Sequence, residues 1–534
     1  MKFQKPIKVI DYSKNIKNID YLLTDYPNQI ELTGNKLIRI EKSGYIILDF
    51  GKEISGGIRI FTNDIAKNST VRIRFGESLG EACSEIGEKG STNDHSPRDI
   101  EVKLSMFSDL TFGQTGFRFV RLDFKGDFWL LRNILASIDT DQREEIGYFE
   151  CDDELVNKIW QTASYTLRLN LHNGLFWDGV KRDRLCWIGD AYPETIAAYC
   201  LYNKTDEVKN TLDFTKDTAI DWCCNMPTYD LWFMLIVHAK YKYDGNKEDL
   251  SRYINFIKNS LLNLNKAIDE DGTTHLSYNF IDWPSHYNGG DGGELIKKDD
   301  EITGVSYLLK LTAQKMIELF TLVKDDEIVN VSKEIIKKIN NSNLKTKKFK
   351  QIAALGVACG EDDDKLDILL KNGAHGLSTF QSYFILSAIA HYGKYDEALK
   401  FLKEYYGGML SIGATTFFED FDLEWLENAS GLDEMPVEGK KDIHGDYGKF
   451  CYTGYRHSLC HGWSAGVIPY IVENIVGLKR INATHFTLEP HLSTLKKLEC
   501  HIPTISGLIK IKIKSENQKL KIDIDKPKGI TIKK

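Results

Sequence analysis

The stretch CDDELVNKIWQTASYTLRL, residues 151–169, decides the fold class of this chain. Before it, apolar residues alternate with polar ones. Within it they recur every four positions, the spacing that places them on one face of an α-helix. These residues are Leu155, Ile159, Ala163 and Leu167. Asp152 is the predicted N-cap, because the next two acidic residues then lie at the positive end of the helix dipole. The sequence therefore predicts that a helical region begins near residue 150.

Helical spacing continues downstream. The runs that show it are residues 229–243, 250–267, 304–323, 326–340, 379–390, 395–405 and 463–476. At roughly 28 residues for a helix with its loop, about a dozen helices fit between residues 150 and 480. After residue 485 the alternating pattern returns, since Ile509, Ile511 and Ile513 are separated by lysines. We therefore expect a long all-α region followed by a small β region.

Upstream, residues 25–140 carry the period of two that is typical of half-buried strands. Val71, Ile73 and Phe75 alternate with arginines, and glycines and polar clusters interrupt such runs. Short alternating strands with turns between them indicate an antiparallel sandwich. The predicted organisation is an N-terminal β-sandwich at residues 1–142, an all-α region at residues 143–482 and a small antiparallel β domain at residues 483–534.

The composition supports a folded chain of more than one domain. With 534 residues, the chain exceeds the ~250–300 residues at which a single core stops growing. Hydrophobic residues make up 42% and charged residues 27%, which are ordinary globular values. The 69 basic residues against 77 acidic ones give a formal net charge of −8, which argues against a nucleic-acid-binding chain.

Neither a membrane anchor nor a secretion signal is expected. The sequence has no run of roughly 18 uncharged apolar residues, and its first segment, MKFQKPIKVIDYSKNIKN, has no apolar core. The ten cysteines are scattered without a CxxC pair, so we expect reduced, buried thiols and predict no metal and no cofactor. These features favour a cytoplasmic protein with no membrane partner.

The densest cluster of reactive side chains is residues 177–194, WDGVKRDRLCWIGDAYPE. Four carboxylates, three basic residues and two tryptophans share these 18 positions. The carboxylates are Asp178, Asp183, Asp190 and Glu194. A solvated loop would also form ion pairs, but here Trp177 and Trp187 would shelter the charges. Carboxylates buried beside arginines acquire divergent pKa values, which lets one site hold both an acid and a base.

Three further segments combine acidic, aromatic or histidine side chains. Residues 280–284, with Asp282 and Trp283, precede the glycine-rich residues 288–293 and fit a sugar-binding loop or a turn equally well. Residues 413–425 interleave acids with aromatics around Glu419, as carbohydrate clefts do, although alone they also fit an amphipathic edge. Residues 456–466 hold a serine and His461, but without a GxSxG elbow they do not support a serine hydrolase.

The pattern Asp-x-x-x-Arg-Asp-x-x-x-Trp-x-x-Asp resembles the catalytic signature of glycoside hydrolase family 78, the α-L-rhamnosidases. Its residues here are Asp178, Arg182, Asp183, Trp187 and Asp190. Other stretches similar to that family are residues 48–51, 76–77, 116–120, 143–149, 282–283, 413–419 and 458–466. The resemblance thus covers nearly the whole chain in the same order.

The resemblance implies a central (α/α)6 barrel flanked by an N-terminal jelly-roll-like sandwich and a small C-terminal β domain. It also implies an inverting mechanism, in which an acid protonates the leaving oxygen and a base about 6.5–9.5 Å away activates water. The acid position falls on Asp183 and the base on Glu419. The residues expected to bind the sugar are Asp178, Arg182, Trp187, Asp190, Asp282, Trp283 and His461.

Two positions depart from the family pattern. The acid is Asp where the family usually has Glu, which shortens its reach by about 1.5 Å. Asp190 and Glu194 are therefore further candidates for the acid. Asp420 follows the base, where many members carry Arg.

The expected function is release of terminal α-L-rhamnose from small glycosides or oligosaccharides. Two alternatives stay open: a barrel glycosidase for another deoxyhexose or a uronate-containing saccharide, and a catalytically impaired sugar-binding protein. The expected partner is a carbohydrate rather than a nucleic acid or a membrane, and a homo-oligomer is left open.

Overall fold

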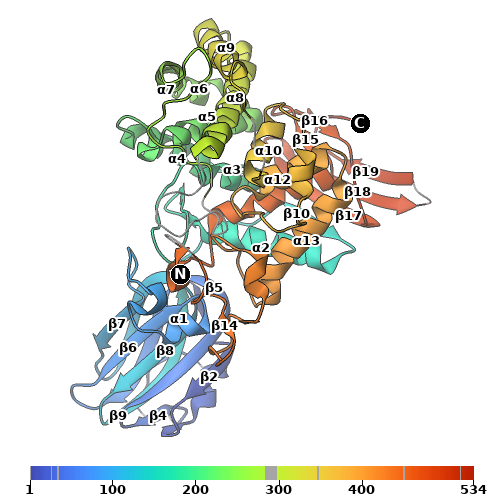
Figure 1. Cartoon of the computed structure of the whole chain (residues 1–534). Coiled ribbons are helices and arrows are strands. Elements are labelled where there is room, and N and C mark those ends of the chain that lie inside the picture. The colour runs from blue at the N-terminus through green and yellow to red at the C-terminus, as the bar shows by residue number, and fades with distance from the viewer. Residues whose placement is uncertain are drawn as a thin grey trace.

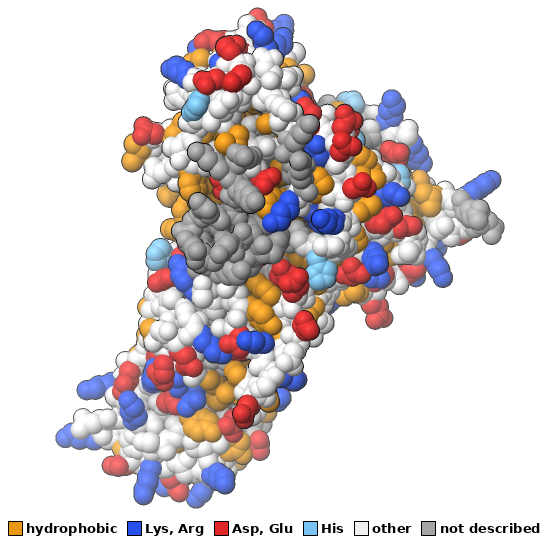
Figure 2. Space-filling model, viewed as in Figure 1, with side chains coloured by type: hydrophobic (Ala, Val, Ile, Leu, Met, Phe, Trp, Pro, Cys, Tyr) orange, Lys and Arg blue, Asp and Glu red, His pale blue; other side chains and the backbone are white. Residues whose placement is uncertain are grey.

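The computed structural model describes residues 2–25, 27–32, 35–282, 298–344, 348–448, 452–516 and 519–534. Strands form one end of the molecule, helices the centre and the opposite end, and a second group of strands one side (Figure 1). Acidic and basic side chains are intermixed over the face that Figure 2 shows. Within the described ranges, no helix is long and apolar enough to cross a membrane.

The N-terminal part is a nine-stranded sheet in which every pair is antiparallel. Its strands are β1 (Lys2–Gln4), β2 (Lys8–Tyr12), β3 (Ile16–Lys17), β4 (Ile38–Glu41), β5 (Gly44–Ile65), β6 (Thr70–Gly76), β7 (Asp99–Lys103), β8 (Ser108–Lys125) and β9 (Phe128–Ile138). They follow the order β3-β4-β9-β5-β8-β6-β7, with β1 on β9 and β2 on β5. The alternation predicted for Val71 and Ile73 is confirmed, because both are fully buried on β6.

The long strands β5 and β8 pair along most of their length, with register shifts after Asp49 and Gly56. Such shifts mark bulges, which bend and twist a strand. The first half of β5 lies between β2 and β8, and its second half lies between β9 and β8. The antiparallel strand content expected for this region is present.

The long helices of the described residues, together with several short ones, lie between residues 154 and 475. They are α2 (Glu154–Leu169), α3 (Ala191–Leu201), α4 (Asp206–Thr218), α5 (Pro227–Asp244), α6 (Lys247–Ser251), α7 (Ile254–Lys266), α8 (Lys298–Val323), α9 (Asp326–Asn340), α10 (Lys350–Ala358), α11 (Leu366–Leu370), α12 (Ser382–His391), α13 (Tyr395–Ser411) and α14 (Val467–Tyr470), which continues into the π-helix η9 (Ile471–Ile475). The helical region expected from the sequence is therefore present. Helices α3, α4 and α10 lie outside the runs predicted from periodicity.

The predicted N-cap of the first long helix is wrong by one residue. Asp153 is the N-cap of α2, and its side chain accepts from the backbone N–H groups of Leu155 and Val156. Asp152 instead accepts from the backbone of Lys496 at 3.0 Å. Asp152, the N-cap predicted from local sequence, thus forms a long-range contact with the C-terminal part instead of capping the helix.

Six helices contact one another in a closed cycle: α3 with α5, α5 with α8, α8 with α10, α10 with α12, α12 with α14 and α14 with α3. The other long helices lie against members of this cycle, as α2 does against α3, α4 against α5, α9 against α8 and α13 against α12. We call the six helices the inner ring. The loops that precede α3, α12 and α14 therefore lie at the N-terminal ends of inner-ring helices.

The C-terminal part contains two small sheets. Strands β10 (Tyr148–Cys151), β17 (Lys497–Thr504), β18 (Gly507–Glu516) and β19 (Lys519–Asp525) form the first, which is antiparallel. Strands β15 (Leu478–Arg480), β16 (His485–Leu488) and β20 (Thr531–Lys533) form the second, in which β16 and β20 are parallel. The expectation of a purely antiparallel C-terminal unit is wrong for that pair. Strand β16 pairs with β20, the last strand of the chain, and parallel strands cannot be joined by a tight hairpin.

Short elements complete the chain. They are helix α1 (Leu79–Cys83) and the two-residue strands β11 (Leu171–His172), β12 (Leu175–Phe176), β13 (Ala429–Ser430) and β14 (Lys441–Asp442). The nine cysteines among the described residues are free, and six of them are buried. Cys83, Cys186 and Cys224 are half-buried, so full burial was too broad an expectation.

The turn from β6 into α1 carries two glutamates from the N-terminal sheet into the helical part. Lys181 Nζ lies 3.1 Å from Glu77 and 3.3 Å from Glu81, and all three side chains are buried. Glu53, on β5, belongs to the same group, because burial and the charges of Glu77 and Glu81 raise its pKa well above the usual range. Lys181 and Arg98, which lies 3.7 Å from Glu81, thus face three buried carboxylates, an excess of negative charge that favours proton uptake.

Glu77 should make stability depend on pH. Burial raises its pKa to about 7, although Lys181 opposes the shift. Its folded state then holds a proton that the unfolded chain has released, so this contribution is full below about pH 4.5 and is lost as pH rises through 7. Glu77→Gln cannot ionise and should flatten that fall by about 1.4 kcal/mol for each unit of pKa shift.

The measurement is urea unfolding between pH 5 and 8, with the exposed Glu144→Gln as the matched control. If Glu77→Gln and wild type lose stability with the same slope, Glu77 does not hold the proton.

Candidate active site

Three segments that are far apart in the sequence meet at one end of the inner ring. Gly179 and His461 form an isolated antiparallel bridge, and the Gly462 N–H donates to the Asp178 carbonyl at 2.8 Å. The Glu419 N–H donates to the Ser458 carbonyl at 3.0 Å. Main-chain hydrogen bonds therefore join residues 177–190, 413–422 and 457–463, the three segments in which the sequence placed most of the site.

Glu419 is held from several sides. Its Oε2 accepts from Arg182 Nη2 at 2.5 Å and from the Ser458 N–H at 3.1 Å. Its own carbonyl accepts from Thr379 Oγ1 at 2.6 Å and from Trp463 Nε1 at 3.0 Å. With 6% of its surface exposed, the side chain has little freedom to leave this position.

Arg182 bridges the two predicted catalytic carboxylates. Its Nη1 donates to Asp183 Oδ2, while its Nη2 donates to Glu419. Since one guanidinium contacts both groups, ordinary hydrogen-bond lengths keep the two carboxylates within about 8 Å of each other. Arg182 is itself buried, so the bridge lies at the inner end of the site.

Asp183 lies on a strained turn. Asp183 and Arg184 have φ values of +56° and +55°, a left-handed conformation that costs a non-glycine residue about 1–2 kcal/mol. The N-terminal sheet holds this turn: His95 Nδ1 lies 2.7 Å from the Asp183 carbonyl, and Arg184 Nη1 donates to the Gln114 carbonyl at 3.0 Å. Strain of this kind clusters at functional sites, where surrounding contacts over-determine it.

His461 lies between two carboxylates, Asp190 of this loop and Glu419. Its Nε2 lies 3.8 Å from Asp190 and 3.7 Å from Glu419, while its buried Nδ1 has no hydrogen-bond partner among the described residues. Asp178 Oδ1 accepts from the N–H groups of Gly179 and Leu185, which closes the loop on itself.

Glu194 lies close behind these groups. A Cβ at Gly462 would lie only 1.5 Å from Glu194 Oε1, so the site requires glycine there.

Burial sets the electrostatics of the site. It raises the pKa values of Asp178, Asp190 and Glu194 well above the usual range, and neighbouring carboxylates add to the effect. Burial also raises the pKa of Glu419, with the positive charge of Arg182 acting in the opposite direction. The pKa of His461 falls well below its usual value through burial and the Arg182 charge, so its imidazole is neutral at pH 7.

The predicted binding residues are only partly brought together. Asp282 is buried and accepts from Ser378 Oγ, next to the threonine that binds the Glu419 carbonyl. Trp187 stands edge-on to Tyr229, whose hydroxyl lies 3.5 Å from Asp190 Oδ1. Trp283 and the glycine-rich residues 288–293 lie outside the described residues.

The aromatic residues expected to shield the charges of the loop from water make other contacts as well. Trp177 stacks on His172 at 4.1 Å and lies under the Arg184 guanidinium. Tyr192 packs on Trp232 and Phe384 in the interior of the ring.

Sequence reasoning missed the contacts that position Glu419, the predicted base. The Ser458 N–H binds Glu419, and the Ser458 Oγ lies 3.3 Å from Glu77. Glu77 also accepts from the Leu459 N–H at 2.6 Å. A single glutamate after a strand has no periodicity or motif that would reveal this contact in the sequence.

One buried cluster has the spacing of metal ligands, but a lysine fills it. Ligand atoms of Glu77, Glu81 and His444 lie within 4.8 Å of one another. Lys181 Nζ lies 3.1–3.3 Å from all three side chains, so its ammonium takes the place that a cation would need.

Comparisons with known proteins agree with this geometry. Residues 144–343 match the model of the bacterial α-L-rhamnosidase six-hairpin glycosidase domain. A curated α-L-rhamnosidase of Formosa agariphila is 22% identical over 581 residues, which cover 95% of this chain and 56% of that protein.

Two solved structures have the same fold. The GH78 family rhamnosidase of Bacillus sp. GL1 superposes with a TM-score of 0.74 at 18% identity, over 97% of this chain and 55% of that one. The α-L-rhamnosidase from Dictyoglumus thermophilum gives a TM-score of 0.72 at 17% identity, over 100% and 58%. This chain therefore spans somewhat more than half the length of each of these relatives. Its residues 144–343 are similar to the six-hairpin glycosidase domain of bacterial α-L-rhamnosidases.

Proposed function

We propose that this protein is an inverting glycoside hydrolase that releases terminal α-L-rhamnose from small glycosides or oligosaccharides. The observation that carries the proposal is the pair Asp183 and Glu419, bridged by Arg182 within the loops of a rhamnosidase-type domain. Their separation of at most about 8 Å is compatible with the 6.5–9.5 Å that leaves room for a water molecule in inverting enzymes.

Glu419 is the proposed general base. Burial raises its pKa, which makes the carboxylate more basic, and Arg182 with the Ser458 N–H opposes that rise. The hydrogen bonds to Oε2 leave Oε1 to face the reaction. From there it can take a proton from the water that attacks the anomeric carbon.

Asp183 is the proposed general acid. Its side chain is 24% exposed, against 6% for Glu419, so it lies on the more open side of the pair, where a leaving group must depart. Arg182 and Arg456 both approach its carboxylate. Asp190 and Glu194 are the alternatives, because burial raises their pKa values well above the usual range.

The same inference extends to the sugar pocket and the architecture. Asp178, Asp190, His461 and Asp282 supply polar groups for sugar hydroxyls, with Trp187 as an apolar wall. The cycle of six inner helices supports an (α/α)6 barrel. The proposed units are a jelly-roll-like sandwich at residues 1–142, the barrel at residues 143–482 and a β domain at residues 483–534.

The function is tested with p-nitrophenyl α-L-rhamnoside beside a panel of other aryl glycosides. We expect the rhamnoside to be the best substrate and NMR to detect first the anomer opposite to that of the substrate. Preference for another sugar would move the proposal to a different deoxyhexose or a uronate. Loss of all turnover with retained rhamnose binding would identify an impaired, sugar-binding protein.

Glu419→Gln should lower kcat by about 10²–10⁴-fold, the usual effect of removing a general base, because the amide keeps the shape but cannot take a proton. KM and the circular dichroism spectrum should change little. The exposed Glu424→Gln, five residues away, is the matched control and should keep full activity. Turnover of Glu419→Gln within a few-fold of wild type would rule out this base.

Asp183→Asn should abolish hydrolysis of alkyl rhamnosides, whose alkoxide leaving groups need a proton. Aryl rhamnosides with acidic phenols depart unaided and should keep much of their rate. The exposed Asp221→Asn serves as the control. Equal losses on both substrate classes would mean that Asp183 positions the sugar, and Asp190 or Glu194 would then become the acid.

A further inference from the structure

A cavity lies inside the inner ring, beside β15, β16 and β17. Its volume is about 640 Å³, within the ~300–1,000 Å³ typical of small-molecule sites. It is lined by the C-terminal halves of α5, α8 and α10, by α3 and α12, and by residues of β15, β16 and β17. The cavity extends from the first turns of α3 and α12, at Tyr192 and Tyr383, to these strands, and neither Asp183 nor Glu419 is among its lining residues.

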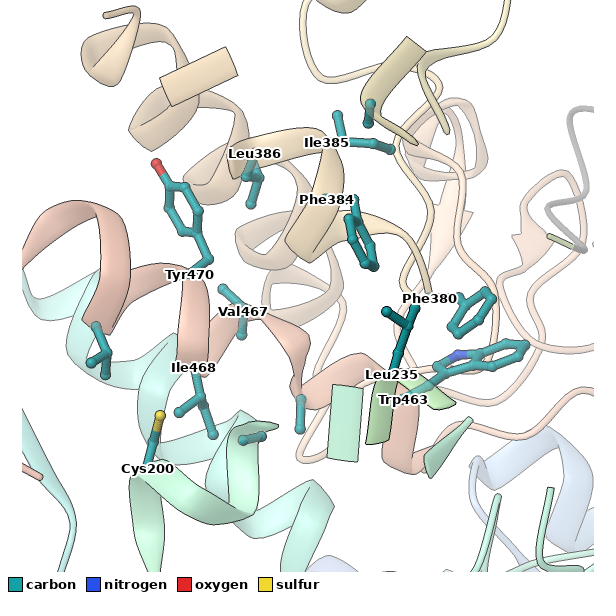
Figure 3. Packing of buried hydrophobic residues seen from close by; sticks show 14 of the residues in the cluster. Cys200, Leu235, Phe380, Phe384, Ile385, Leu386, Trp463, Val467, Ile468 and Tyr470 are labelled. Atoms are coloured by element: carbon teal, nitrogen blue, oxygen red, sulfur yellow. The ribbon is translucent and has the colours of Figure 1, made fainter. Parts of the chain in front are cut away.

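A layer of aromatic rings separates the cavity from the active site. Trp463, whose indole binds the Glu419 carbonyl, stacks on Phe380 at 4.9 Å. Phe380 contacts Trp232, which in turn packs against Tyr192 and Phe384 on the cavity side. Figure 3 shows Phe380 and Trp463 side by side, with Phe384 farther along the same chain segment. A ligand in the cavity therefore cannot be the sugar bound at Glu419.

The cavity wall holds two cations that lack anionic partners. No carboxylate of the described residues lies within 4.0 Å of Lys242 Nζ, and no hydrogen bond to it is formed there. Arg480 donates through Nη2 to the Pro503 carbonyl, but its buried Nη1 has no partner in the described part of the chain. Burial lowers the pKa values of both groups, although the negative charge of nearby Glu473 acts in the opposite direction on each.

The other charged groups of the wall are largely engaged. Asp362 pairs with His391 at 2.9 Å, and Lys315 pairs with Glu318 at 3.1 Å. Glu473 accepts from the Tyr383 hydroxyl at 2.7 Å. Four Lys or Arg side chains and two carboxylates line the cavity, so its charge is positive.

We propose that this cavity is a second binding site, which takes a small anion carrying a carboxylate or phosphate on an aromatic or aliphatic body. Lys242 and Arg480 would contact the anionic group. Tyr199, Phe384 and Phe486 line the same space and would contact the apolar body. The inference goes beyond the proposed hydrolase activity, and neither depends on the other.

A bound anion would give Lys242 and Arg480 an oppositely charged partner. An unpaired buried charge is destabilising, and pairing it with an anion removes that cost. Arg480 already lies over the rings of Tyr243 and Phe486, at 4.7 Å and 4.6 Å, which fixes the direction of its guanidinium. Lys242 is therefore the better position for a test, because its replacement leaves those ring contacts intact.

The test uses isothermal titration calorimetry of the full chain with benzoate and phenyl phosphate, and with neutral benzyl alcohol as the uncharged probe. We expect saturable one-to-one binding of at least one anion, at least tenfold tighter than that of benzyl alcohol. Lys242→Met, which removes the charge and keeps most of the length of the side chain, should weaken it at least tenfold. Glu419→Gln should leave it unchanged, because that residue lies beyond the aromatic layer.

Thermal unfolding gives an independent readout. Lys242→Met removes a half-buried charge that has no ion-pair partner among the described residues, and it should raise Tm without ligand. The matched control Lys240→Met, two residues away on α5, breaks ion pairs with Asp244 and Asp249 and should lower Tm while preserving anion binding.

The proposal is overturned if neither anion binds saturably, or if Lys242→Met binds as tightly as wild type. Binding that is lost in Glu419→Gln but kept in Lys242→Met would place the anion in the active site instead and would equally reject the second site.

Discussion

Two adjacent buried cations, Lys181 and Arg182, hold the architecture of the site together. Lys181 forms ion pairs with Glu77 and Glu81, which follow strand β6 of the N-terminal part. Arg182 forms ion pairs with Asp183 and Glu419. Removing one partner of a buried ion pair leaves an uncompensated charge, which is far more costly than a lost surface contact. The loop is thereby fixed between two acidic groups that come from opposite sides.

This arrangement makes the N-terminal sheet a structural part of the site. His95 and Gln114 hold the left-handed turn at Asp183, and Glu77 holds the Ser458–Leu459 backbone that binds Glu419. A strained turn persists only where its surroundings over-determine it, and here they belong to a different part of the chain. The helical part alone would lack these supports.

The candidate active site and the cavity inside the inner ring differ in charge. Carboxylates concentrate at the candidate active site, around the neutral His461, whereas Lys242 and Arg480, which have no ion-pair partner among the described residues, line the cavity. An aromatic layer through Trp232, Phe380 and Trp463 lies between the two.

The sequence by itself determined the succession of β, α and β regions, because hydrophobic periods of two and of about four are local properties. It also located the acidic loop at residues 178–190 and Glu419, since unusual residue combinations are visible without a fold. Only the tertiary structure decided what those residues contact. The cap of α2 passed from Asp152 to Asp153 because Asp152 binds residues 496–497, more than three hundred positions away. The contacts of Arg182, the support from Glu77 and the unpaired state of Lys242 likewise depend on packing between distant segments, for which a single sequence has no local signal.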